Sequence, residues 1–453
     1  MTQSTPTQQT IKHMIHTKHI NYFYGFSDFN TTNLTEKLPK LIEQYANLKN
    51  KSYINQTENR AITHHQLRES HQTNNLLADI QSIESQLPDH ITTICHVGIG
   101  GSIVGPKFID HVLDTWQTPK KRHAIFISSH DEEHIAKKLQ HVTINETYFI
   151  VVSKSGKTIE IEKTIDEICR LKNTEKTTLL KNQAIAITTK LSAFKESDFK
   201  NTLYFDNGVG GRFSTTSHVG MITIGLCYGE SSIASILWGA KKADENATSL
   251  TDNMSATQAL IRFEQLKQFA GLSIVPYGES LVELIPFTSQ LICESLGKGA
   301  LVSNQLSLNQ HAPILMTGSG PDAQHTFFQQ LHQGHPIIPV EFYMIAPTQS
   351  NQNHLLEQII GQSISLFKGQ HNNNPHHHFE GNRPSTITLM KQKTSEAIGF
   401  LIAMIENRIM FEGFLHNINA FDQPGVELGK QMTKQQTTAN SLGRQLFNKL
   451  TNL

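Results

Sequence analysis

Strand-like runs alternate with helical patterns along this chain, and that alternation limits its fold more than any other feature. Four short β-rich runs, each ending in or followed by Gly, Ser or Thr, occupy Ile91–Val97, Ala124–Ser128, Thr147–Val152 and Ala184–Thr188. Helical stretches lie between them, and Ile159–Leu171 is the clearest. This pattern is typical of a parallel α/β sheet, which binds ligands beyond the carboxyl ends of its strands.

The same alternation returns later in the chain. Residues 231–271 are helical in composition, Leu272–Tyr277 is strand-like, and a helix is expected over about Glu283–Leu296. Pro313–Thr317 and Pro336–Phe342 are further strand candidates. The sequence therefore predicts two doubly wound parallel-sheet lobes joined by helices, although no residue-level repeat is detected.

The two ends of the chain are expected to add helices to these lobes. Before residue 90, Leu34–Leu48 and Ile62–Leu87 have helical periodicity. His371–Pro384 is loop-like, a strong apolar helix follows it, and the tail beyond Phe421 is expected to end helically. The expected domains are a helical extension (1–60), a first lobe (61–225), linker helices with a second lobe (226–415), and a C-terminal segment (416–453).

Charge and composition exclude several classes of function. Lys plus Arg total 39 and Asp plus Glu total 39, so no general affinity for nucleic acid or anionic membranes follows. The longest apolar run, Ala397–Ile405, is far shorter than the roughly 18 residues of a membrane span. Met1–Ile20 lacks the apolar core of a secretion signal. Four well-separated cysteines are expected to be reduced core residues of a cytoplasmic protein: Cys95, Cys169, Cys227 and Cys293.

Two strand ends carry residues suited to a phosphate group. In Gly98–Ser102, glycines permit close backbone approach and the next helix directs N–H groups at a bound anion. A tight turn or a dinucleotide loop would look similar, although Val104 stands where that loop has its third glycine. Ser153–Thr158 sets three hydroxyls and an ammonium at a helix amino terminus, where all can donate to a phosphate; an ordinary helix cap is the alternative.

Two other motifs suit a reaction with a negatively charged intermediate. Arg212 follows a glycine pair in VGGRFS, where its guanidinium could stabilise an oxyanion or form a structural ion pair. Glu294 shares a helix face with Gln290, four residues earlier. Among Leu291–Cys293 its carboxyl could be partly buried and act as a general base, whereas a surface glutamate is the alternative.

Further candidates lie toward the carboxyl end. His325 could transfer protons near neutral pH, and a structural histidine is the alternative. Gln423 and Lys430 flank a turn and helix start, where a solvated lysine is the alternative. His376–His378 suggests a metal, but consecutive loop histidines cannot all face one ion and no carboxylate cluster accompanies them, so no metal site is predicted.

Taken in order, these motifs resemble the signature stretches of the phosphoglucose isomerase (glucose-6-phosphate isomerase) family. They read GIGGS, SKSGKT, VGGRFS, ESLGK, AQHTFFQQLHQG and FDQPGVELGK over about residues 91–433, and the short chain resembles the compact bacterial form. The resemblance implies reversible isomerisation of glucose 6-phosphate and fructose 6-phosphate through a cis-enediol(ate), in glycolysis and gluconeogenesis. It also implies two sugar-isomerase (SIS) lobes, a cytoplasmic homodimer with interfacial active sites, and no metal or organic cofactor.

The resemblance assigns roles residue by residue. Glu294 matches the base that moves a proton between C1 and C2, and Arg212 matches the cation that steadies the intermediate. His325 matches the ring-opening histidine supplied by the neighbouring subunit, and Lys430 its companion at the ring oxygen. The matched substrate-binding positions, for the phosphate and for orientation, are Gly101, Ser102, Ser153, Lys154, Ser155, Thr158, Gln290 and Gln423.

Some residues depart from the family pattern. Gly320–Ala323 replaces the usual Gly-Thr-Asn-Gly, Lys157 replaces a hydroxyl residue, and Leu296 replaces an asparagine. These changes bear on affinity and substrate range and leave every proposed catalytic side chain in place. Two alternatives stay open: a sensor that binds phosphosugars without turnover, and an isomerase for another hexose phosphate such as mannose 6-phosphate.

Overall fold

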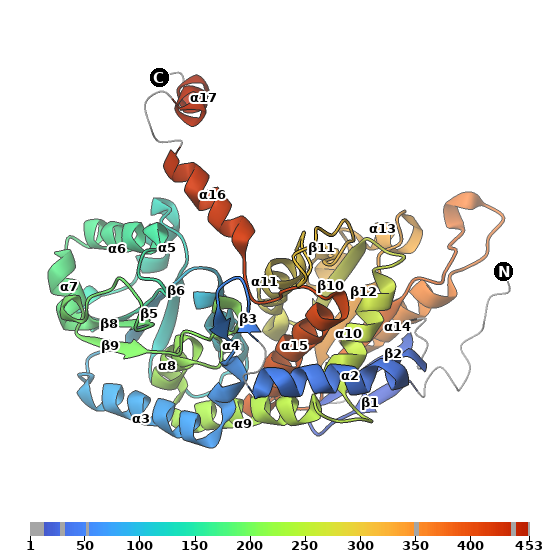
Figure 1. Ribbon diagram of the computed structural model, residues 1–453, viewed down its shortest axis with the longest axis horizontal. Helices are drawn as coiled ribbons and strands as arrows, with labels where there is room; N and C mark the ends of the chain where they lie inside the picture. The colour runs from blue at the N-terminus through green and yellow to red at the C-terminus, as the bar shows by residue number, and fades with distance from the viewer. Residues whose placement is uncertain (1–12, 28–31, 51–53, 348–352, 436–440, 452–453) are drawn as a thin grey trace.

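The computed structural model describes residues 13–27, 32–50, 54–347, 353–435 and 441–451. Two sheet-containing lobes lie side by side, and long helices run along one side of both (Figure 1). No helix in these ranges is long and apolar enough to cross a membrane. The predicted α/β class with two lobes is confirmed.

The first lobe is built on a parallel five-stranded sheet in the order β6-β5-β7-β8-β9. The chain goes from β5 outward to β6 and then back past β5 to β7, so the gap between β5 and β7 is the switch point where such sheets bind ligands. All four predicted strands are present, and β9 was not predicted. The strands are β5 (Thr93–Val97), β6 (His123–Ile127), β7 (Thr147–Val152), β8 (Ala184–Thr188) and β9 (Asn201–Tyr204), and the helices are α4 (Val104–Thr115), α5 (Glu132–Leu139), α6 (Ile159–Leu171) and α7 (Lys176–Gln183).

The second lobe repeats this path in a six-stranded sheet of order β1-β2-β13-β12-β10-β11. Here β10 is flanked by β11 and β12, so the gap between β10 and β12 is its switch point. The parallel strands are β10 (Gly271–Tyr277), β11 (Ile314–Thr317), β12 (Val340–Ile345) and β13 (Ser385–Met390), and the helices are α11 (Leu284–Leu296), α12 (Gly320–Gln324), α13 (Phe328–Gln333) and α14 (His354–Lys368).

Two boundaries in this lobe differ from the prediction. Strand β12 begins at Val340 instead of Pro336, because Pro336 and Pro339 have no N–H to contribute to a strand ladder. Strand β13 was not predicted; it lies between the predicted loop and the helix that follows.

The N-terminal extension, expected to be mostly helical, contains two strands between residues 14 and 26. Strands β1 (Met14–His16) and β2 (Ile20–Phe26) form a hairpin, and β2 pairs antiparallel with β13 of the second sheet. In β2 alternate residues are buried, a period-two pattern that overrides helix propensity. Helix α2 (Thr32–Lys49) matches its prediction, whereas the second predicted helix divides into a short 3-10 helix, η1 (His64–Arg68), and α3 (Ser70–Gln86).

Four helices lie between the two sheets, and two of them, α9 and α10, are those that the composition of residues 231–271 predicted. Helices α9 and α15 cross closely because Gly239 and Gly399 leave room: a Cβ at Gly399 would lie 1.8 Å from the Ile236 carbonyl oxygen. Buried ion pairs accompany the crossing, including Arg68 with Asp244 at 2.7 Å. The four helices are α8 (His218–Tyr228), α9 (Glu230–Asn246), α10 (Met254–Gln265) and α15 (Ser395–His416).

The C-terminal helices α16 (Pro424–Gln435) and α17 (Leu442–Thr451) project away from both lobes (Figure 1). One cysteine also departs from expectation. Cys95, Cys169 and Cys227 are buried, but Cys293 is exposed, because its neighbours Leu291, Ile292, Ser295 and Leu296 occupy the inward face of α11.

Candidate active site

The first phosphate-binding candidate is a short turn after β5, the 3-10 helix η2 (Gly100–Ser102). Gly100 has a φ of +54°, and a Cβ at Gly101 would lie 2.3 Å from the carbonyl carbon of Gly211. Both positions therefore favour glycine, and this turn packs directly on the backbone beside Arg212. Beneath it, buried His96 donates from Nε2 to the Ser102 carbonyl at 2.7 Å, while burial lowers the pKa of His96 to about 4.

The second candidate is the hydroxyl-rich turn between β7 and α6. Ser153 Oγ lies 3.1 Å from Thr158 Oγ1 and accepts from the Gly156 N–H at 3.1 Å. Ser155 Oγ accepts from the Lys157 N–H at 3.2 Å. These bonds set three hydroxyls at the amino terminus of a helix, beside the switch point of the first sheet.

Lys154 is oriented differently from a lysine that would bind phosphate. Its ammonium donates to the carbonyls of Asn207 and Val209, each at 2.9 Å. Burial lowers its pKa to about 8. In this structure Lys154 ties the second turn to the loop that leads into Arg212.

Arg212 is the centre of the cluster and is almost fully buried. Its Nε donates to Ser295 Oγ at 2.6 Å, and its Nη1 donates to Gln423 Oε1 at 2.8 Å. The same Nη1 lies 3.4 Å from Glu294 Oε2. Burial lowers the pKa of Arg212 to about 10, so the guanidinium is still charged at neutral pH.

Glu294 and Gln290 face this guanidinium from α11. Gln290 Nε2 donates to Glu294 Oε1 at 3.0 Å, as their four-residue spacing predicted. The Glu294 side chain is 29% exposed, so the expectation of a partly buried carboxyl is confirmed. A Cβ at Gly100 would lie 3.0 Å from Gln290 Nε2, which shows that the first phosphate-binding turn adjoins the carboxylate.

Sequence reasoning missed the residues that hold Gln423 in place. Lys298 Nζ donates to the backbone carbonyl of Asp422 and, at 2.9 Å, to its Oδ1. Asp422 Oδ2 accepts from Asn419 Nδ2 at 3.0 Å, and the Asp422 carbonyl accepts from Arg212 Nη2 at 3.0 Å. A buried lysine–aspartate pair thus fixes the segment before Gln423. Lys298 stands in the ESLGK motif and Asp422 in FDQPG, but neither residue type alone signals this pairing.

Comparison with known proteins assigns this cluster to a family. The sequence model of phosphoglucose isomerase matches residues 84–451. A glucose-6-phosphate isomerase of Borreliella afzelii is 32% identical over 466 residues, covering 93% of this chain and 86% of the relative. One from Chlamydia felis is 33% identical over 362 residues, covering 77% and 67%.

The chain belongs to the phosphoglucose isomerase family. The crystal structure of a glucose-6-phosphate isomerase from Chlamydia trachomatis has the same fold: its TM-score is 0.87 at 25% identity, covering 98% of this chain and 94% of that one. The family resemblance recognised in the motifs is therefore confirmed. The boundaries of the four predicted domains stay a prediction.

Of two further residues with family-implied roles, one lies outside the cluster and the side chain of the other is not described. His325 is exposed at the end of α12, and its side chain makes no hydrogen bond with the described residues. Lys430 lies on α16, but its side chain is outside the described residues. Their roles in this phosphoglucose isomerase family member stay predictions.

The described part of the chain contains no group of three His, Cys, Asp or Glu side chains placed to hold a metal ion. In the His376–His378 run, His376 and His377 are exposed and His378 is half-buried. Gln333 Nε2 donates to the backbone carbonyls of His376 and His378 at 3.2 and 2.9 Å. That contact gives the run a structural role in holding the loop against α13.

Proposed function

We propose that Glu294 carries a proton between C1 and C2 when this chain interconverts glucose 6-phosphate and fructose 6-phosphate. The supporting observation is the placement of Glu294 between Gln290 and Arg212, next to the turn at Gly100–Ser102. Aldose–ketose isomerisation needs one base that reaches two adjacent carbons, so a single carboxylate suffices. One oxygen of Glu294 accepts from the Gln290 amide, and the other, whose contact with Arg212 Nη1 is 3.4 Å long, is proposed to accept the proton when substrate is bound.

Arg212 is proposed to stabilise the cis-enediol(ate). Negative charge develops on the oxygens at C1 and C2 when the proton leaves, and a fixed cation in a buried site stabilises it without reorganising. Four hydrogen-bond acceptors on two segments hold this guanidinium: Ser295 on α11, and Gln423 with the carbonyls of Ala420 and Asp422 in the segment after α15. Its contact with Glu294 at 3.4 Å is long for a charge-assisted bond, so the carboxylate is not tied up by it.

The two turns after β5 and β7 are proposed to bind the phosphate. Ser102, Ser153, Ser155 and Thr158 offer hydroxyl donors, and η2 and α6 direct backbone N–H groups to the same switch point. The phosphate is remote from C1 and C2, so its binding energy can hold the reacting end in position.

Ring opening is proposed to need a second copy of the chain. His325 is exposed and lacks hydrogen-bond partners among the described side chains, and α17 exposes four apolar residues on its surface: Leu442, Leu446, Phe447 and Leu450. A homodimer would cover such residues and could bring the partner's His325 to the substrate. Lys430 is proposed to assist at the ring oxygen, and the enzyme is proposed to work in the cytoplasm without a cofactor.

The test is a coupled assay from fructose 6-phosphate to glucose 6-phosphate, run also with mannose 6-phosphate. Glu294→Gln keeps the shape and the bond to Gln290 but removes the base, so turnover should fall to background while sugar-phosphate binding persists. The control is Glu245→Gln. Glu245 is an exposed carboxylate on α9 whose ion-pair partner among the described residues is Lys242, and its substitution should change neither turnover nor sugar-phosphate binding.

Retained turnover in Glu294→Gln would remove Glu294 from the mechanism. Binding without turnover in the unaltered chain would instead favour the phosphosugar sensor. Chelator in parallel reactions tests the expected independence from metal.

A further inference from the structure

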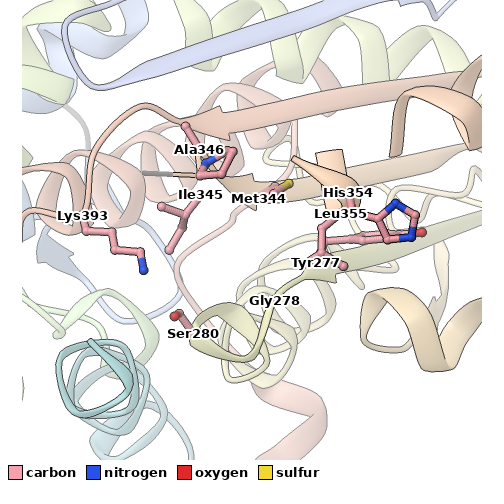
Figure 2. Close-up of a pocket in the computed structure, with 10 residues that line it drawn as sticks. Tyr277, Gly278, Ser280, Met344, Ile345, Ala346, His354, Leu355 and Lys393 are labelled. Carbon is pink, nitrogen blue, oxygen red and sulfur yellow. The ribbon is translucent and has the colours of Figure 1, made fainter. Parts of the chain in front are cut away.

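The second lobe has a pocket of about 290 Å³ at its own switch point. It is formed where β10 and β12 end, by Tyr277 and Gly278 from one strand and by Met344–Ala346 from the other (Figure 2). It lies on β-strand ends of the second sheet, whereas the phosphate-binding turns described above follow β5 and β7 of the first. In open α/β sheets, a crevice at this position is where ligands bind.

The turn that enters this pocket repeats the turn that enters the active site. After β5 the chain reads Gly100-Gly101-Ser102, and Gly100 has a φ of +54°. After β10 it reads Gly278-Glu279-Ser280, and Gly278 has a φ of +94°. Gly100 is the first residue of the 3-10 helix η2, whereas Gly278 immediately precedes a 3-10 helix at Glu279–Leu281, and the two turns lead into α4 and α11. The two lobes thus share a topology and, in the turn that follows their first strand, a glycine of positive φ two residues before a serine.

Polar side chains lie on both sides of the pocket. Figure 2 shows the Lys393 ammonium and the Ser280 hydroxyl on the same side of Ile345, with Tyr277, His354 and Leu355 on the other. Lys393 follows β13, the strand next to β12, and its ammonium forms no ion pair with a described carboxylate. A flexible ammonium beside a hydroxyl is a common way to bind phosphate.

None of the described carboxylates forms an ion pair with this lysine. Glu283 is paired with Lys107 at 2.7 Å, whereas Glu279, adjacent to Ser280, is exposed and lies 3.6 Å from His111. At the other end, His354 lies 3.7 Å from Glu357 on its own helix. The rest of the lining is mainly apolar (Met344, Ile345, Pro347 and Leu355), which suits the carbon skeleton of a small ligand.

We propose that this pocket is a second ligand site for a small phosphate monoester, with its phosphate at Lys393 and Ser280. The site is separate from the catalytic cluster, and its existence does not depend on the reaction proposed above. Each lobe would then bind a phosphorylated metabolite. The second lobe also carries the proposed catalytic base, Glu294 on α11.

The experiment counts binding sites on the full chain. Sorbitol 6-phosphate is a suitable probe because it has the phosphate and carbon chain of the substrate but no carbonyl, so it cannot be isomerised. Equilibrium dialysis should give two sites per chain. The double variant Lys393→Met, Ser280→Ala should weaken one site at least about tenfold, because a bond to a charged group is lost, and should leave turnover unchanged.

The matched control is Lys391→Met, an exposed lysine two residues earlier whose ammonium donates to the Thr17 carbonyl at 3.1 Å outside the pocket. It should keep both sites. One site per chain, or two unchanged sites in the double variant, would overturn the proposal. If the double variant does not fold, crystals of the unaltered chain can be soaked in sorbitol 6-phosphate. Electron density for the ligand between Lys393 and Ser280 would support the proposal, and its absence there would overturn it.

Discussion

The parallel strands of the two lobes follow the same order around the switch point, but different side chains line the two switch points. In the first lobe, hydroxyl side chains line both strand ends, and the turns are tied to Arg212 by glycine packing and by Lys154. In the second lobe, the equivalent position has Ser280, Lys393, Tyr277 and His354 as its polar side chains in a mainly apolar lining. The shared topology supplies a crevice, and the local side chains decide what chemistry happens there.

The proposed base, Glu294, comes from the other lobe. Helix α11 follows the short helix that contains Ser280 of the pocket, and Glu294 lies in its last turn, so the first helix of the second lobe reaches the switch point of the first lobe. On the proposed mechanism, catalysis depends on contacts between the lobes, above all those of Arg212. The predictions below probe that asymmetry, from the largest effect to the smallest.

The largest expected effect on kcat is that of substituting Arg212. Arg212→Lys keeps the charge but loses the planar fork that reaches Ser295 and Gln423 together. We expect kcat to fall about 10²–10³-fold, as when one preorganised oxyanion donor is removed, with a smaller change in KM. Steady-state kinetics measures it, and Arg170→Lys on the exposed face of α6 is the control. An unchanged kcat would contradict the role of Arg212.

The location of this cluster could be predicted from the sequence because it rests on short local patterns. Glycine-rich or hydroxyl-rich ends of β5 and β7, and the spacing of Gln290 and Glu294, each have a direct physical meaning. The Lys298–Asp422 pair joins residues far apart in the chain, and the sequence carries no sign of their contact. For Lys154 the residue type suggested a phosphate ligand, whereas its orientation depends on two carbonyls that only folding brings near.

The fold shows the same division between local and long-range information. Buried parallel strands such as β7 and β10 read as continuous apolar runs and were found. Strand β13 was missed, and β2 was mistaken for part of a helical region, because antiparallel pairing of β2 with β13 depends on residues over 300 positions apart.

The glycines of the paired turns should respond unequally. Gly101→Ala would place a Cβ 2.3 Å from the Gly211 backbone, which must move with Arg212. Gly278→Ala meets no atom within 4 Å and costs only the strain of its positive φ, of order 1–3 kcal/mol. We therefore expect Gly101→Ala to lower kcat/KM at least tenfold and Gly278→Ala to leave it unchanged. Equal effects of the two variants on kcat/KM would contradict this reading.

Removing hydroxyl groups at the two switch points should have different effects on the KM for isomerisation. Ser153→Ala with Thr158→Ala removes two donors from the proposed phosphate site, and we expect KM to rise about tenfold with a smaller change in kcat. Ser280→Ala is the matched change in the second lobe and should leave KM for the isomerisation unaltered. A rise in KM for Ser280→Ala would show that the second pocket takes part in turnover.

The smallest expected effect is on the pH dependence of stability at alkaline pH. It comes from the buried ammonium of Lys154, which joins the second turn to the loop before Arg212. Burial lowers its pKa from 10.5 to about 8, so between those values the unfolded chain binds more protons at this residue than the folded chain. Stability contributed by this residue must then rise as pH increases from 8 to 10.5. The free energy of unfolding, measured by urea denaturation at pH 7.5 and 10, should increase with pH relative to Lys154→Met.

The control from the second lobe is Lys393→Met. The ammonium of Lys393 is exposed and makes no comparable pair of carbonyl bonds among the described residues. If the unaltered chain and Lys154→Met show the same pH dependence, the Lys154 ammonium is not buried as described, and it would be available to a phosphate after all.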